Sequence, residues 1–167
     1  MKLTLFIAIA FWVTSSCHST DTAAVATIAN NATGNNQLSF KINGQLWAAD
    51  NEIFAAYHPK GYNKAILMAG SKGPKDKNEQ AFNINLYNIN GPGTYEIKNG
   101  NADNCVVQLA NLSPENYLYG SMMGYHIKVM LIKCSSPATI EARFEGWLLG
   151  NNSDTLKITE GYFNYAE

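Results

Sequence analysis

The chain has 167 residues, of which 46% are hydrophobic and 15% charged, and its formal net charge at pH 7 is −1. This length suits one domain with a full hydrophobic core, even after removal of a short leader. The 12 basic and 13 acidic residues are scattered, which excludes the concentrated basic face that nucleic-acid binding requires.

The first 16 residues have the pattern of an export signal. Lys2 precedes an uncharged apolar run over residues 3–13, and three small hydroxyl residues follow before Cys17. The run is about 11 residues long, too short for a membrane-spanning helix, which needs about 20. We therefore expect residues 1–16 to be removed as a signal peptide.

Cys17 stands where signal peptidase II would leave a mature N-terminus whose thiol carries diacylglycerol. Ser16 before it is small, although Thr14 occupies the position where a strict lipobox has leucine. The polar residues 18–36 suit a flexible tether. We expect a lipoprotein, with palmitate-type acyl chains at Cys17, anchored to the outer membrane on its periplasmic or surface face. Simple secretion is the alternative.

The number of cysteines agrees with this expectation. The chain has three, and a lipid on Cys17 would leave Cys105 and Cys134 free to pair. An oxidising envelope would let such a disulfide bond persist. The alternative is a pair of buried free thiols.

From Gln37 onward the hydrophobic period is two, which is typical of half-buried strands. Leu38 and Phe40 alternate with polar residues, and Asn43-Gly44 has the turn chemistry of a hairpin. Further runs, separated by breakers rich in Gly, Pro and Asn, cover 46–47, 52–58, 63–69, 80–87, 94–98, 105–110, 126–134, 139–149 and 156–165. We expect residues 37–167 to form a single all-β domain, an antiparallel β-sandwich or flattened barrel of about nine strands.

Several short motifs carry a family resemblance. These are "FKINGQLWAAD" early in the domain, "GPGTYEI" in the middle, and the late pair "EARFEGWL" and "LKITEGYFNY". In these motifs the chain resembles a family of small Bacteroidetes lipoproteins of unknown function, which open with a strand, an Asn-Gly turn and Trp-x-Ala and close with Gly-x-Phe. The resemblance implies an all-β lipoprotein domain and implies no chemistry.

Residues that could perform catalysis are few. Ser121 in "YGSMMG" lacks the glycine spacing of a nucleophile elbow. Four residues of extended strand place Glu141 and Glu145 about 13 Å apart, beyond the roughly 5–9.5 Å of a glycosidase pair. His58 and His126 have no neighbouring ligand motif. We therefore predict a non-enzymatic protein with no catalytic residues, metal or cofactor; a secreted hydrolase is an alternative.

Aromatic and amide side chains indicate ligand binding more strongly than the residues above indicate catalysis. Tyr117, Tyr119 and Tyr125 cluster in "NYLYGSMMGY", and such rings stack on sugars while asparagine amides bond hydroxyl groups. Trp47 and Trp147 fall inside strands, and we expect both to fill the core. The prediction is a binding or interaction module for a glycan or protein partner, with the three tyrosines as the possible ligand surface.

A closed barrel would favour a different function. It would carry a small apolar ligand, as a lipocalin does, in a pocket lined by residues such as Met68, Ile84 and Met130. The identity of the partner and the oligomeric state stay open at the level of sequence.

Overall fold

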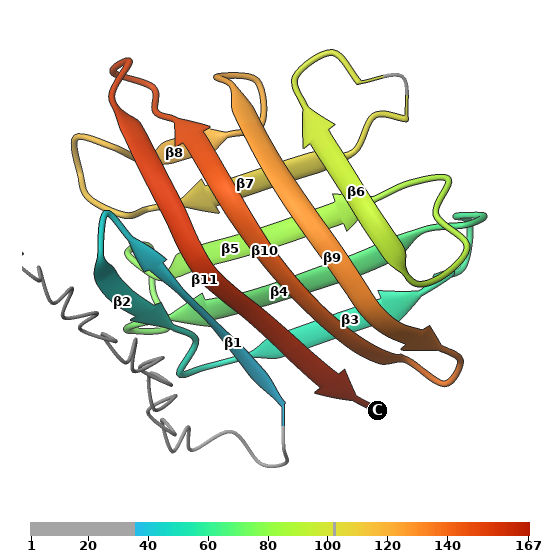
Figure 1. Cartoon of the computed structure of the whole chain (residues 1–167). Helices are drawn as coiled ribbons and strands as arrows, with labels where there is room; N and C mark the ends of the chain where they lie inside the picture. The colour runs from blue at the N-terminus through green and yellow to red at the C-terminus, as the bar shows by residue number, and fades with distance from the viewer. Residues whose placement is uncertain (1–35, 102) are drawn as a thin grey trace, which may run out of the picture.

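The computed structural model describes residues 36–101 and 103–167, and their regular structure is entirely β (Figure 1). The strands are β1 (Gln37–Ile42), β2 (Gln45–Ala48), β3 (Ile53–Tyr57), β4 (Ile66–Lys72), β5 (Gln80–Leu86), β6 (Gly93–Lys98), β7 (Val106–Ala110), β8 (Leu118–Gly120), β9 (Tyr125–Ser135), β10 (Thr139–Leu149) and β11 (Thr155–Ala166). No helix in this part of the chain could cross a membrane. The expected signal peptide and lipidated Cys17 lie outside the described residues.

The strands form two antiparallel sheets that lie face to face (Figure 1). One has six strands in the order β2-β1-β11-β10-β9-β6, and the other has five in the order β3-β4-β5-β7-β8. The predicted all-β sandwich is therefore confirmed, whereas the flattened barrel is not, because the sheets stay separate apart from one bridge between Tyr119 and Gly150. There are more strands than the nine or so expected from sequence; β8, of three residues, was too short to register as a hydrophobic run.

The core between the sheets contains a cluster of aromatic rings. Phe40 stacks on Trp47 with ring centroids 4.7 Å apart and meets Phe82 at 4.5 Å. Phe82 in turn stacks on Phe144 at 5.4 Å. The indole N–H of Trp47 donates to Gln80 Oε1 at 2.7 Å, which satisfies its polar atom next to the core. The prediction that Trp47 fills the core is confirmed.

The space between the sheets is filled by side chains, which removes the basis for a lipocalin-like ligand pocket. Met68 and Ile84, expected to line such a pocket, are 2% and 1% exposed and belong to the packed core. Met130, the third expected residue, points outward from β9 and is 46% exposed. Its position on the strand alternates with buried Val129 and Leu131, as the two-residue period of a strand requires.

The predicted disulfide bond between Cys105 and Cys134 does not form; both thiols are free. The hydroxyl of Tyr125 donates to the backbone carbonyl of Cys105, which places Cys105 beside the start of β9. Cys134 lies nine residues further along the same strand, about 30 Å away at the rise of extended chain. A disulfide bond requires Cα atoms within about 7 Å of each other.

A β-bulge interrupts the centre of the six-stranded sheet. Between the pairs Phe144↔Gly161 and Gly146↔Ile158, β11 has two residues, Thr159 and Glu160, where β10 has only Glu145. Such a bulge bends the strand and increases its local twist. Gly146 has φ +150°, and a Cβ atom there would overlap the backbone carbonyl oxygen of His126 on β9. The sheet therefore tolerates only glycine at this point of close approach.

Candidate functional site

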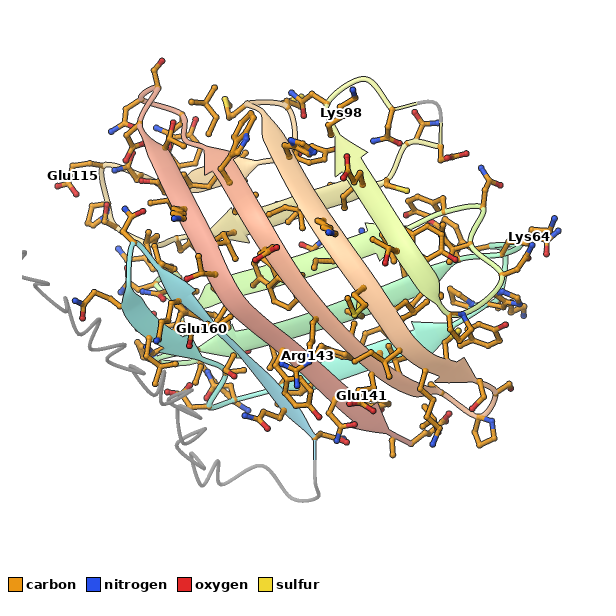
Figure 2. The ribbon with its side chains drawn as sticks, in the orientation of Figure 1. Lys64, Lys98, Glu115, Glu141, Arg143 and Glu160 are labelled. Carbon is orange, nitrogen blue, oxygen red and sulfur yellow. The ribbon has the colours of Figure 1, made fainter. Side chains whose placement is uncertain are left out.

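The outer face of the six-stranded sheet, the face turned away from the core, carries most of the chain's strand-borne charged side chains. Strand pairing places them in rows across the sheet. One row contains His126, Trp147 and Lys157, and the next contains Glu96, Lys128 and Glu145. Figure 2 looks onto this face. The alternation along each strand thus collects ionisable and aromatic groups on a single surface.

These two rows surround a hollow of about 320 Å³. Its walls hold one indole, one imidazole, two carboxylates and two amines, from Trp147, His126, Glu96, Glu145, Lys128 and Lys157. Gly146, Ile158 and Thr159, the residues at the bulge, complete the lining. The hollow therefore lies directly beside the bulge. Bulges are over-represented next to binding sites, where they redirect side chains.

Trp147 is the central feature of the hollow. It is 40% exposed, which is unusual for tryptophan within a strand. The ring of His126 meets it edge-on, with centroids 6.5 Å apart and an interplanar angle of 90°. The expectation that Trp147 fills the core is therefore wrong. The strict alternation of β10 could have shown this, since buried Ala142, Phe144 and Leu148 leave the odd-numbered positions outside.

The charges around the hollow are balanced. Two carboxylates face two amines, and Lys128 pairs directly across the sheet with Glu96 on β6 and with Glu145 on β10. His126 Nε2 lies 3.6 Å from Glu96 Oε2. The site therefore offers acceptors from the glutamates and donors from the lysines, with no net charge when His126 is neutral.

A second hollow, of about 260 Å³, lies on the outer face of the five-stranded sheet. Its side chains are mainly small or apolar, with Phe54 on β3 as the exposed aromatic residue at 45%. Ala69, Ala81 and Asn83 form much of the rest. Glu52 is its one charged residue, so this hollow lacks the convergent hydrogen-bonding groups of the first.

The three tyrosines predicted as a ligand surface do not form one. Tyr119 and Tyr125 are 1% and 5% exposed and belong to the core, whereas Tyr117 is 57% exposed in the preceding loop. Tyr119 is buried because β8 pairs with β7 and turns the ring inward. The exposed aromatic side chain beside the larger hollow is that of Trp147, which lies outside this cluster.

The histidine and serine residues considered as catalytic or metal-binding candidates lie far apart in the fold. His58 stacks on Tyr57 at 4.0 Å, next to the five-stranded sheet, while His126 lies on the other sheet. Ser121 follows β8 in a turn with φ +48°. Within residues 36–101 and 103–167, no three His, Cys, Asp or Glu side chains group as a metal site would need.

Comparisons with known proteins give no further guide to this site. No family model, curated protein or solved structure matches the chain.

Proposed function

We propose that this protein is a lipid-anchored, non-enzymatic module of the cell envelope that binds a neutral glycan in the hollow around Trp147. The observation that carries the proposal is the exposed indole of Trp147 in a hollow ringed by hydrogen-bonding side chains. One face of a sugar ring is rich in C–H bonds and packs on an aromatic surface, while its hydroxyl groups need donors and acceptors at the edge.

The balance of charge favours an uncharged ligand. A hydroxyl group both donates and accepts, so it can donate to Glu96 or Glu145 and accept from Lys128 or Lys157. An anion would meet the two carboxylates at close range, and a cation would meet the two amines. The carboxylates also lie beside cationic side chains, which suits them to accept hydrogen bonds from a ligand.

The proposed anchor is Cys17. The apolar run before it, the small residue at position 16 and the polar stretch after it support lipidation. Intact-mass measurement of the protein extracted from membranes tests this part: we expect an N-terminus at Cys17 with the added mass of diacylglycerol and acyl chains. An unmodified N-terminus beyond Cys17 would remove the anchor from the proposal and leave the binding site unaffected.

A glycan array tests the binding site. The chain of residues 18–167, which includes every described strand, is compared with its Trp147→Ala, Trp147→Phe and Phe54→Ala variants. We expect the parent to bind neutral glycans, Trp147→Ala to lose binding, and Trp147→Phe to retain part of it. Phe54→Ala is the matched control, because it removes an aromatic side chain of similar exposure from the other sheet. Binding that survives Trp147→Ala, or an array without binding, would refute the proposal.

A further inference from the structure

Arg143 is the one arginine of the chain, and its guanidinium has no acceptor among the described residues. It lies on β10 on the same outer face as Trp147, and its Cζ stands 5.7 Å from the ring centroid of Tyr162 on β11. Figure 2 shows it beside Glu141 on this face, yet the two form no ion pair within 4.0 Å. A planar guanidinium held on an aromatic ring keeps its N–H donors available at its edge.

The position of Arg143 continues the line of the hollow. The outward residues of β10 run in the order Trp147, Glu145, Arg143, so each lies two positions along the strand from the next. Trp147 and Arg143 are thus about 13 Å apart along the strand. This span is longer than a single sugar ring, and Glu145 lies between its ends as part of the hollow.

The neighbouring strand has exposed apolar side chains along the same line. Met130 on β9 pairs directly with Arg143 on β10 and is 46% exposed. Ile132, further along β9, is 41% exposed. The core does not use these side chains, and they follow Lys128 in the direction away from the hollow. Beyond the hollow, therefore, the surface again offers apolar area next to hydrogen-bond donors, the combination found at Trp147.

We propose that the ligand is an extended neutral polysaccharide that lies along β10, with one sugar unit on Trp147 and a later unit on Arg143, Tyr162 and Met130. This rests on the proposed function and deepens it, because it specifies the neutral glycan as a chain whose separate sugar units make separate contacts. Trp147 provides the first contact, and the donors of Arg143 bond hydroxyl groups of the later unit. Affinity then grows with the number of sugar units until both contacts are occupied.

The probes are four soluble neutral polysaccharides, a xylan, a mannan, a mixed-linkage glucan and a galactan, in affinity electrophoresis of residues 18–167. Fragments of one to six units from each retarding polymer are then measured by calorimetry. We expect the six-unit fragment to bind at least about tenfold more tightly than the single sugar, as one added hydrogen bond to a charged group would provide. Arg143→Ala should remove this increment and leave single-sugar binding unchanged. Lys72→Ala, which removes a cation from the other sheet, should change neither.

The outcomes separate this inference from the proposed function. Trp147-dependent binding on the glycan array with equal affinity for one and six units, or with no polymer retarded, would refute the extended ligand and leave glycan binding intact. An equal loss by Arg143→Ala at every fragment length would refute the second contact as well, because it would indicate a general effect on the sheet. Absence of binding in both experiments would refute the proposed function itself.

Discussion

The hydroxyl of Tyr119 donates a hydrogen bond of 2.6 Å to Asp154 Oδ2, and so ties the last strand of the five-stranded sheet to the turn between β10 and β11. The same turn approaches β8 at Gly150, where a Cβ atom would overlap both Tyr119 and Asp154. This half-buried contact and the bridge between Tyr119 and Gly150 join the two sheets at this edge, in addition to the hydrogen bond between Trp47 and Gln80. When Tyr119 no longer donates, water can reach the exposed Asp154 carboxylate and replace part of the lost hydrogen bond.

Tyr119→Phe should therefore destabilise the domain. The substitution keeps the ring in the core but leaves the Asp154 carboxylate without this donor. We expect a loss of about 0.5–1.5 kcal/mol in the free energy of unfolding, the range for a typical hydrogen bond, because the exposed Asp154 carboxylate is partly screened by water. Urea denaturation at pH 7 measures it, with Tyr117→Phe as the control, since Tyr117 is 57% exposed. An equal stability of the two variants would contradict the role of the contact.

The stability of the fold should fall in alkaline solution. Burial, followed by the hydrogen bond and charge of Asp154, raises the pKa of Tyr119 well above its ordinary value of 10. Burial also raises the pKa of Tyr125 and of Tyr162. Because the unfolded chain loses these protons first, the stabilisation is complete below pH 10 and declines as pH rises above it.

Urea denaturation between pH 7 and pH 11 checks this dependence. The parent should lose stability from about pH 10 upward. Tyr119→Phe should show a shallower decline above that pH, because it lacks one of the groups whose proton is held more tightly in the folded state. A decline of the same steepness in both proteins would show that Tyr119 does not contribute.

Gly146→Ala should be strongly destabilising. The new Cβ atom would overlap the His126 carbonyl oxygen and approach the Cα atom of Ile127, and the backbone angle of φ +150° disfavours a side chain. We expect a loss of at least about 2 kcal/mol, in the range of overpacking combined with backbone strain. Gly91→Ala is a suitable control, since its added Cβ would meet nothing within 4 Å. Thermal unfolding of the two variants should differ clearly.

The two cysteines of the domain should react at different rates. Cys105 is 3% exposed and its Sγ accepts from the backbone N–H of Tyr87, whereas Cys134 is half-buried near the end of β9. We expect a thiol reagent to modify Cys134 in the folded protein and Cys105 only after unfolding. Mass spectrometry counts the labels. A chain that takes up no label until it is reduced would show that the two cysteines are bonded after all.

Much of the fold was open to prediction because strands with one buried face repeat every two residues. In β5, Phe82, Ile84 and Leu86 are buried and Asn83 and Asn85 are not. This alternation alone indicates which face of the strand points to the core. Turn residues marked most of the boundaries. The short β8 was not predicted because three residues do not establish a period. The burial of Tyr119, which lies on β8, was not predicted for the same reason.

The site was harder to predict because it depends on pairing between strands. Trp147, His126 and Glu96 belong to three strands, and only the register of β10, β9 and β6 brings them together. The bulge at Thr159 and Glu160 leaves no distinct pattern in a single sequence. The prediction that Cys105 and Cys134 form a disulfide bond was wrong because it relied only on the number of cysteines. The distance between the two thiols depends on the length of β9, which separates them.

The first strand, β1, begins at the end of the six-stranded sheet that lies far from the hollow. Gln37 pairs with Asn164 near the end of β11, and Asn164 pairs across the sheet with Glu141. Trp147 is six residues further along β10 from Glu141, about 20 Å away. The chain that leads from Cys17 therefore enters the domain at the end of the sheet opposite the hollow (Figure 1). If Cys17 carries the proposed lipid, the anchor joins the domain far from Trp147 on the sheet, and its point of attachment leaves the hollow uncovered.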